Sequence, residues 1–391
     1  MDVQVEGQTD PRFDRVKQSF AELWSGIEVG AALCVYYQGQ PVVDLWGGYT
    51  DRERQTPWRA DTLVNVYSTT KGIAAFTFAL LVDDGKICYE DKVADYWPEF
   101  AVNGKANITV AQLLSHQAGL CGVDETLRVE DLYDWAKMVR LLAEQKPLWS
   151  PGKASGYHAV TWGYLVGELA LRITGMTLGE LFQNRVANPL GLNFYLGLPV
   201  EKHAECASLI GPNHARSSIQ VNAGGTNQAV PPNKYFQASL LNPPISPFKD
   251  ACSKEWRLAE IAASNGHGDA RSIARLYALM AGDGELRGTR LISQQTITAA
   301  RKPEVENSVD LVTGTKIRRS RGFILSHGGN YGPGQHAFGH AGAGGSMAFA
   351  DPDAELSFCY VMNQMQPDSE TETRAAKLIR STYNAIENIP T

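Results

Sequence analysis

The sequence predicts a mixed α+β protein in which both ends of the chain build one antiparallel sheet flanked by helices. Strand-like apolar runs occur near both ends, whereas the middle carries helical patterns separated by loops. The 391 residues are enough for two lobes. We expect residues 1–67 and 290–391 to form the lobe with the sheet, and residues 68–289 to form an inserted, mainly helical lobe.

The N-terminal region predicts a helix followed by a β-hairpin. Residues 30–37 and 41–46 are apolar and rich in β-forming side chains, and residues 38–40 provide a turn between them. The helix before them is indicated by apolar side chains at helical spacing, namely Phe13, Val16, Phe20, Leu23 and Trp24.

The middle and the end of the chain predict further helices and one more pair of strands. Residues 212–249 contain six of the nineteen prolines without clear periodicity, which is typical of a lid, a binding loop or a disordered segment. The predicted helices cover 109–115, 129–144, 161–174, 269–280 and 370–386, and the predicted strands cover 346–350 and 356–362.

Composition and charge exclude several classes of partner. The chain is 43% hydrophobic and 20% charged, as in ordinary globular proteins, and no apolar run reaches the length of a membrane span. The net charge of -6 and the absence of a long basic run argue against nucleic acid and anionic membranes. The densest basic cluster is Arg318, Arg319 and Arg321, which we expect to form a solvated strand face.

The N-terminus and the cysteines favour a cytoplasmic protein. Residues 1–18 have neither the basic region nor the apolar region of a secretory signal. The six cysteines are far apart and form no C-x-x-C pair, which favours reduced, mostly buried thiols over disulfides or a zinc site. They are Cys34, Cys88, Cys121, Cys206, Cys252 and Cys359.

The clearest chemical motif is a serine three residues before a lysine. Ser68 and Lys71 precede the unbroken apolar run 73–82, which predicts a buried helix with this pair at its start. Residues three apart share one helix face, so the hydroxyl and the amine can form a hydrogen bond. An amine with an ordinary pKa of about 10.4 is protonated at neutral pH, so Lys71 is a base only if burial or a neighbour lowers that pKa.

The same spacing occurs twice more, in a different context. Ser150 with Lys153, and Ser246 with Lys249, each contain a proline directly after the serine. Proline and glycine at these positions predict turns or loops, and neither pair leads into an apolar helix. Ser68 is therefore the predicted nucleophile.

Two further segments carry candidate chemistry. Tyr157 follows the loop 151–156 and precedes the apolar pattern that starts at residue 161, where a phenol can relay a proton. Taken alone, one of fifteen tyrosines is more often a packing residue. Residues 338–346 read as an edge strand running into a glycine-rich turn, whose free N–H groups can help to hold an oxyanion. His327, His336 and His340 lack a carboxylate or cysteine at ligand spacing, so no metal site is predicted.

Taken together and in this order, the motifs resemble the serine β-lactamase and penicillin-binding-protein superfamily, which uses a Ser-x-x-Lys nucleophile. More narrowly, the chain is similar to the family VIII carboxylesterases, which are class C β-lactamase-like. The segments that carry the resemblance are 68–72, 108–120, 151–157, 265–268 and 339–342. The resemblance implies a β-lactamase/transpeptidase-like fold.

The resemblance also implies roles for individual residues. Ser68 would be acylated, Lys71 and Tyr157 would act together as general base and acid, and the N–H groups of Ser68 and Ala343 would form the oxyanion hole. The family's Lys-Thr-Gly element is represented by a substrate-binding segment, His340, Ala341 and Gly342.

Two departures from the β-lactamase pattern favour esters. Ala159 replaces the asparagine of Tyr-x-Asn, and His340 replaces the lysine of Lys-Thr-Gly, so two groups that a β-lactamase uses on its substrate are absent. No segment resembles the glutamate-bearing loop of class A β-lactamases.

The sequence therefore predicts a serine carboxylesterase that hydrolyses short-chain, small-molecule esters without a cofactor. Alternatives with the same site are acyl transfer to an alcohol or amine, and hydrolysis of amides, peptides or β-lactams. An alternative of another class is a non-catalytic binding protein.

Overall fold

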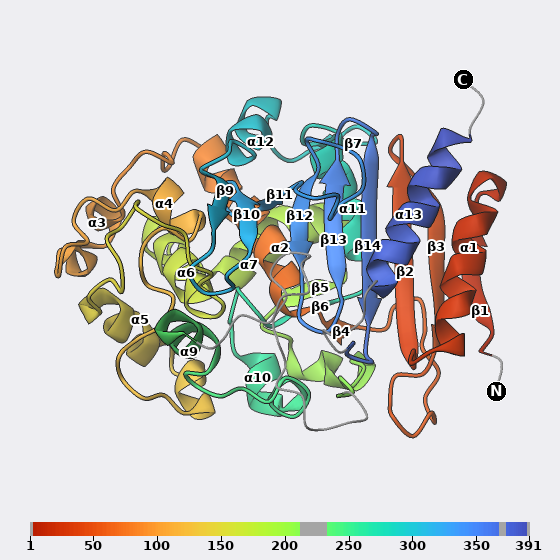
Figure 1. The fold of residues 1–391 in the computed structure, drawn as a ribbon, viewed down its shortest axis with the longest axis horizontal. Helices are drawn as coiled ribbons and strands as arrows, with labels where there is room; N and C mark the ends of the chain where they lie inside the picture. The colour runs from red at the N-terminus through yellow and green to blue at the C-terminus, as the bar shows by residue number, and fades with distance from the viewer. Residues whose placement is uncertain (1–2, 212–232, 367–372, 389–391) are drawn as a thin grey trace.

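The computed structural model describes residues 3–211, 233–366 and 373–388. Its largest element is a nine-stranded sheet with the strand order β1-β3-β2-β14-β13-β12-β11-β10-β9 (Figure 1). All neighbouring strands in this sheet are antiparallel. The strands are β1 (Val5–Thr9), β2 (Gly30–Tyr37), β3 (Gln40–Gly48), β9 (Val305–Val309), β10 (Lys316–Arg319), β11 (Ile324–Leu325), β12 (Phe338–Ala341), β13 (Met347–Asp351) and β14 (Leu356–Met362).

Both ends of the chain contribute to this sheet. β2 pairs with β14 from Tyr37 opposite Leu356 to Ala31 opposite Met362. The β2–β3 turn consists of Gln38 and Gly39, both with positive φ (49° and 70°), as a two-residue hairpin of type I′ requires. The predicted turn, 38–40, was one residue too long, because Gln40 already belongs to β3 and pairs with Tyr37 of β2.

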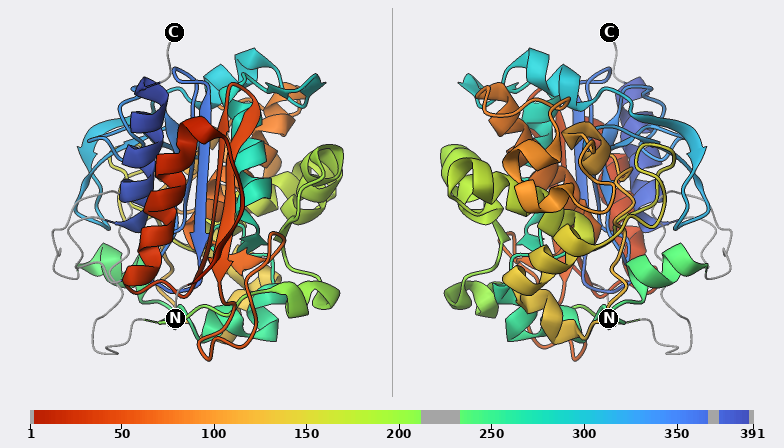
Figure 2. Two further views of the ribbon diagram at one scale, coloured as in Figure 1. Left: turned by 90° about the vertical axis from the view of Figure 1, so that its right-hand side faces the viewer. Right: turned by 90° about the vertical axis from the view of Figure 1, so that its left-hand side faces the viewer.

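Helices cover both faces of the sheet (Figure 2). Alternate side chains of a strand point to opposite faces, and β2 shows this: Leu33 belongs to the core beneath α1 and α13, whereas Cys34 belongs to the core that contains α11. The covering helices are α1 (Asp14–Ala21) and α13 (Arg374–Glu387) on one face and α11 (Ala270–Ala281) on the other.

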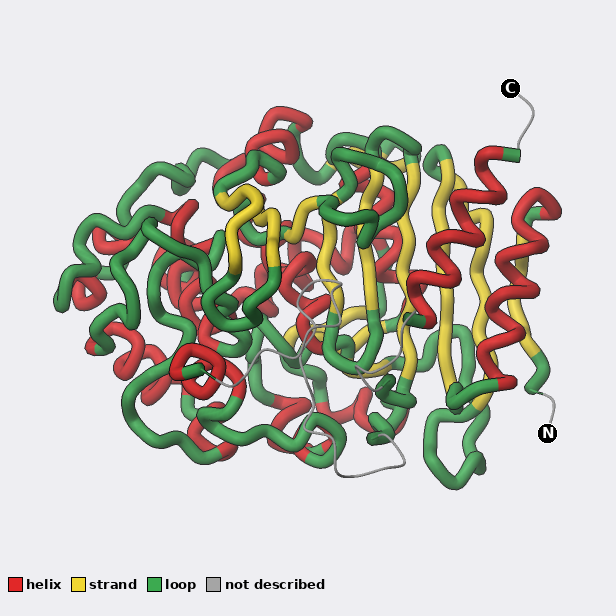
Figure 3. Tube along the Cα trace, in the orientation of Figure 1, coloured by secondary structure: helices red, strands yellow, loops and turns green. Residues whose placement is uncertain are grey.

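Most of the remaining helices lie to one side of the sheet (Figure 3). The remaining α-helices are α2 (Thr70–Asp83), α3 (Val93–Tyr96), α4 (Val110–Leu114), α5 (Trp135–Glu144), α6 (Thr161–Thr174), α7 (Leu178–Phe182), α8 (Asn188–Leu190), α9 (Lys234–Leu240), α10 (Lys254–Leu258) and α12 (Gln294–Ala300). Two small sheets accompany them: β4 (Val64–Asn65), β6 (Gly266–Gly268) and β5 (Phe194–Leu196) form one, and β7 (Glu285–Leu286) and β8 (Thr289–Arg290) form the other. The predicted fold class is confirmed, while the lobe boundaries stay a prediction.

Three local expectations need correction. The predicted helix 129–144 is divided, because Asp134 is extended and its side chain accepts the Lys137 N–H to start α5. Of the proline-rich segment 212–249, residues 212–232 lie outside the described residues, and the rest contains α9. Strand β12 lies between β11 and β13 and is therefore not an edge strand. However, β11 pairs only with Phe338 and Gly339, so the last two residues of β12, His340 and Ala341, pair with β13 alone.

Helix α2 is the buried centre of the molecule. Every residue from 70 to 81 is buried, so this helix is covered around its whole circumference. It contacts helices α6 and α7 as well as strand β12. The start of α2 therefore lies where the helical part meets the large sheet. No helix in the described ranges is long and apolar enough to cross a membrane.

Candidate active site

Ser68 lies in a 3-10 turn (Tyr67–Thr69) that leads directly into α2. Tyr67 adopts a positive φ of 44°, which is uncommon for a bulky residue and is typical of constrained functional turns. Ser68 is 8% exposed, whereas Lys71 is completely buried. The serine residue thus keeps a small exposed surface, while the amine stays away from bulk water.

The other two Ser-x-x-Lys pairs have no such context. Ser150 and Ser246 both lie outside helices, and their lysines, Lys153 and Lys249, are exposed. The expectation that only the Ser68 pair starts a buried helix is confirmed.

The Lys71 amine is surrounded by four oxygen atoms. Its Nζ lies 3.2 Å from Ser68 Oγ and 3.0 Å from the Tyr157 hydroxyl. It also donates to the carbonyl oxygens of Ala159 at 2.8 Å and Ala263 at 2.9 Å. A carbonyl can only accept, so a neutral amine that gives its two hydrogens to these carbonyls directs its lone pair toward the two hydroxyl groups.

Burial lowers the pKa of Lys71 well below its ordinary value, because the charged form loses its hydration and no carboxylate replaces it. The positive charge of Arg319 lowers this pKa further. The lowered pKa favours the neutral amine, which is the form that can accept a proton.

Tyr157 joins the two groups from the loop before α6. Its hydroxyl donates to Ser68 Oγ at 2.5 Å, and the ring lies 4.7 Å from Lys71 Nζ. Burial raises the pKa of Tyr157 to about 12, against the opposing effects of the Ser68 hydrogen bond and of Arg319. The tyrosine is thus a phenol at neutral pH, able to pass a proton between serine and lysine.

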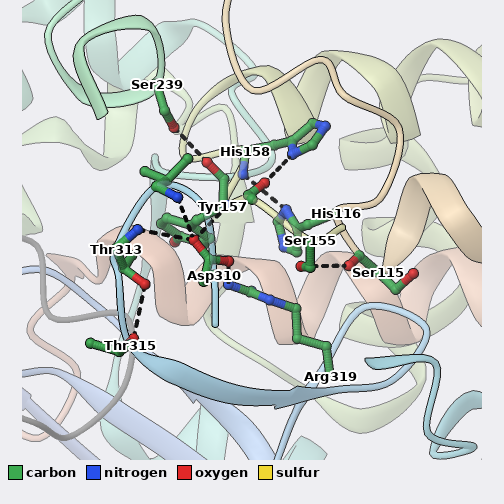
Figure 4. Close-up of polar contacts among 12 residues, drawn as sticks. Ser115, His116, Ser155, Tyr157, His158, Ser239, Asp310, Thr313, Thr315 and Arg319 are labelled. Atoms are coloured by element: carbon green, nitrogen blue, oxygen red, sulfur yellow. Dashed lines mark hydrogen bonds and ion pairs between the residues drawn. The ribbon is translucent and has the colours of Figure 1, made fainter. Parts of the chain in front are cut away.

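The backbone of Tyr157 is fixed by a buried polar network (Figure 4). Its N–H donates to Asp310 Oδ1 at 3.1 Å, and its carbonyl accepts from Ser239 Oγ at 2.5 Å. Asp310 Oδ2 accepts from Arg319 Nη2 at 2.8 Å, and both side chains are almost inaccessible. The expectation of a solvated basic strand face is therefore wrong for Arg319 and also for Arg321, which is 5% exposed.

Two histidines support the same loop. The backbone N–H of His158 donates to His116 Nδ1 at 3.0 Å, and His158 Nε2 accepts the Leu120 N–H at 3.0 Å. The other ring nitrogen of His158 lies 2.6 Å from the Gly156 carbonyl, so this nitrogen carries the hydrogen and the ring is neutral. Burial lowers the pKa of His158 to about 3 and that of His116 well below its usual range.

The end of β12 packs against the serine turn. Ser346 Oγ donates to the Val66 carbonyl at 2.9 Å, and Gly342 lies so close that a Cβ on it would be 2.1 Å from the same oxygen. In the described part of the chain, the N–H groups of Ser68 and Ala343 have no hydrogen-bond acceptor. Two unpaired donors beside a nucleophile suit an oxyanion, although their role stays a prediction.

His340 presents an unpaired nitrogen near the site. Its ring stacks on that of Tyr157 at a centroid distance of 6.2 Å, and its Nδ1 donates to the Ala341 carbonyl at 2.7 Å. Its Nε2 is buried and finds no partner among the described residues. Burial holds the pKa of His340 well below its usual range, so the ring is a neutral acceptor.

Candidate metal ligands do not gather here. Among the residues that the structure describes, no three His, Cys, Asp or Glu side chains form a group that could hold a metal ion. His336 instead bonds Asp353, at 2.8 Å.

The sequence predicted Ser68, Lys71 and Tyr157 as catalytic residues, but it did not predict four groups that surround them. The carbonyls of Ala159 and Ala263 are backbone atoms, for which a sequence carries no side-chain signal. Asp310 and Arg319 belong to a polar stretch that looks like solvent-exposed strand. Arg319 lies on the covered face of β10, and Asp310 lies in the loop before this strand, so the burial of both depends on tertiary packing.

The chain matches known proteins over nearly its full length. The beta-lactamase family model matches residues 16–381. The esterase/beta-lactamase LipL of Mycobacterium tuberculosis is 36% identical over 366 residues, which cover 92% of this chain and 83% of LipL.

Solved structures agree with this match. The crystal structure of a family VIII carboxylesterase has a TM-score of 0.90 and 42% identity, covering 98% of this chain and 100% of that one. A penicillin-binding protein homolog from Caulobacter crescentus has a TM-score of 0.88 and 38% identity, with the same coverage. The predicted resemblance is confirmed: the chain belongs to the beta-lactamase family and is a serine hydrolase.

Proposed function

We propose that this protein is a serine carboxylesterase that hydrolyses short-chain esters through an acyl-enzyme on Ser68. The observation that carries the proposal is the meeting of three groups: the serine hydroxyl, the lysine amine at 3.2 Å and the tyrosine hydroxyl at 2.5 Å. The amine has no carboxylate partner within the described chain, so it is available as a base. The esterase relatives support the choice of an ester.

The first half of the reaction transfers the acyl group to the enzyme. Ser68 Oγ attacks the ester carbonyl carbon while its proton passes to Lys71 Nζ, directly or through the Tyr157 hydroxyl. The N–H groups of Ser68 and Ala343 would hold the negative carbonyl oxygen. When the C–O bond breaks, the Lys71–Tyr157 pair returns a proton to the departing alkoxide, and the alcohol leaves.

The second half uses the same groups in reverse. Water attacks the acyl-enzyme, its proton passes to the pair, and Ser68 Oγ regains a proton as the carboxylic acid leaves. Because Lys71 and Tyr157 share their protons, the pair titrates with common apparent pKa values.

The neutral His340 favours esters over β-lactams. The lysine at this position in the family pattern offers a cation to a substrate carboxylate, whereas His340 offers a buried, uncharged acceptor. Ala159 likewise offers no side-chain amide. Weak β-lactam hydrolysis is the second candidate, because a penicillin-binding protein homolog is among the similar structures.

The decisive test compares substrates and serines. We expect kcat/KM for p-nitrophenyl butyrate to exceed that for nitrocefin, and Ser68→Ala to abolish both ester turnover and labelling by a fluorophosphonate probe. Ser150→Ala is the matched control, since it removes the serine of another Ser-x-x-Lys pair and should leave the rate unchanged.

Each alternative predicts a different result. A preference for nitrocefin would make the protein a β-lactamase. Faster release of product in the presence of an added alcohol, with a new ester formed, would make it an acyltransferase. Wild-type protein that is folded yet neither labelled nor active would be a binding protein.

A further inference from the structure

An ion pair beneath Tyr157 has no part in the reaction described above. Arg319 and Asp310 are 1% and 0% exposed, and the guanidinium carbon lies 5.2 Å from the centre of the Tyr157 ring (Figure 4). Asp310 Oδ1 accepts three backbone N–H groups, from Tyr157 at 3.1 Å, Val312 at 2.9 Å and Thr313 at 3.0 Å. One carboxylate thus fixes both the arginine and the backbone that carries the tyrosine.

Stability alone is a weak reason for such a pair. Removing two charges from water is costly, and a well-packed apolar pair of similar size often stabilises a protein equally well or better. Here the arginine also leaves its Nε buried without an acceptor among the described residues. The placement of the charge beside the Lys71–Tyr157 pair offers a functional reason.

The charged and titratable groups that face the Lys71–Tyr157 pair come from four parts of the fold. Three are histidines that burial keeps neutral, because it lowers their pKa: His116 after α4, His158 before α6 and His340 on β12. The fourth is the Arg319–Asp310 pair from β10 and the loop before it. Arg319 lowers the pKa of both Lys71 and Tyr157, whereas Asp310 raises that of Tyr157.

We propose that Arg319 and Asp310 are positioning residues: Asp310 holds the Tyr157 loop and the guanidinium in place, and the fixed positive charge of Arg319 favours the form of the Lys71–Tyr157 pair that can accept the Ser68 proton. The inference rests on the proposed function of that pair. Neither residue touches the reacting atoms, so both act through the tyrosine and the lysine.

The test measures the pH dependence of kcat/KM in two variants that change charge in opposite directions. Arg319→Gln removes the cation, so the acid limb of the profile should move to higher pH by on the order of one unit. On the acid side of the limb, kcat/KM should be roughly tenfold lower than in the wild type, and at higher pH it should return to the wild-type value. Asp310→Asn keeps an oxygen for the three N–H groups but leaves the cation unbalanced, so the limb should move to lower pH. A purely structural pair would lower the rate at every pH and leave both limbs in place.

Arg321→Gln is the matched control. Arg321 is also buried, pairs with Glu304 and Glu90, and lies over a tyrosine ring, that of Tyr89, at 4.4 Å. It should lower stability without moving the acid limb. If either single variant fails to fold, the double variant Arg319→Gln/Asp310→Asn decides, because it leaves no unpaired charge. A shift of its acid limb to higher pH supports the inference, and an acid limb at the wild-type pH overturns it.

A second readout separates this inference from the proposed function. The rate at which a fluorophosphonate labels Ser68 depends on the same base but requires no ester turnover. Labelling whose pH dependence is identical in wild type and Arg319→Gln overturns the role of the ion pair and leaves the esterase standing. Absence of labelling in the wild type overturns the esterase itself.

Discussion

At the scale of single residues, the environment of Lys71 explains how a lysine can serve as a base. The amine is buried, lacks a carboxylate and gives its hydrogens to two carbonyl groups, those of Ala159 and Ala263. Each of these contacts is available to a neutral amine, and burial penalises the charged one. The hydrogen bonds and the lowered pKa therefore favour the same protonation state.

Lys71→Arg should abolish the esterase reaction, because a guanidinium stays protonated at any working pH. We expect kcat/KM to fall by at least about a thousandfold, as measured with p-nitrophenyl butyrate. Lys105→Arg is the control: Lys105 is also buried, donates to two carbonyls and has a pKa lowered to about 8, but it lies away from Ser68. Retained activity in Lys71→Arg would contradict the role of a neutral amine.

Tyr157→Phe keeps the ring, which packs against His340 and Arg319, and removes only the hydroxyl. The proton relay is lost, so we expect kcat to fall by about 10²- to 10⁴-fold. Tyr164→Phe serves as control, because Tyr164 is buried and its hydroxyl donates to the Leu132 carbonyl at 2.5 Å, far from the chemistry. The control should lose about 1 kcal/mol of unfolding free energy and no activity. Equal activities of the two variants would exclude a relay through Tyr157.

At the scale of secondary-structure elements, the site depends on how closely β12 approaches the serine turn. Gly342 packs on the Val66 carbonyl, and Ser346 Oγ bonds the same oxygen. Thr69 Oγ1 lies 3.1 Å from Ser346 Oγ, so the contact continues into the start of α2. We expect this contact to set the distance between the N–H groups of Ser68 and Ala343, the proposed oxyanion donors.

Gly342→Ala should separate these two elements. Its Cβ would lie 2.1 Å from the Val66 carbonyl oxygen, so the backbone must shift. We expect a loss of roughly 1–3 kcal/mol in unfolding free energy and a fall in kcat of about 10²-fold, since a misplaced oxyanion donor is costly. Gly26→Ala is the control, because the nearest atom to its Cβ is 3.5 Å away. An unchanged kcat in Gly342→Ala would show that this approach does not set the chemistry.

At the scale of the whole molecule, burial of neutral groups links stability to pH. The pKa of His158 and of His267 is lowered to about 3 in the folded chain, against an ordinary value of 6.5. Between these values the unfolded chain binds more protons than the folded one, so stability falls as pH falls. Asp269 acts in the opposite direction, because burial raises its pKa to about 6.

We therefore expect urea unfolding to show a decreasing free energy below pH 6.5, by about 1.4 kcal/mol per pH unit for each such histidine. His267→Gln removes one of these groups. The difference between wild type and variant isolates its contribution from those of the carboxyl groups. If the unfolding free energies of wild type and His267→Gln change in parallel between pH 6.5 and pH 4, the prediction is contradicted.

Much of the fold was predictable because the signals are local. The apolar, β-forming runs at both ends, the helix 161–174 and the apolar run after Ser68 all follow from residue type and spacing within one element. The turn of the first hairpin was placed one residue too long, and the helix 129–144 hid the break at Asp134, since both depend on backbone angles that spacing does not report.

The sequence by itself determined the spacing of the proposed nucleophile pair, because Ser68 and Lys71 are three residues apart on one helical segment, and the order of motifs predicted the family. Only the tertiary structure decided what surrounds that pair. Neighbours on a strand face opposite sides, so nothing local distinguishes the partly exposed Arg318 from the buried Arg319. The charge beside Tyr157, like the carbonyls that orient Lys71, exists only once distant segments pack together.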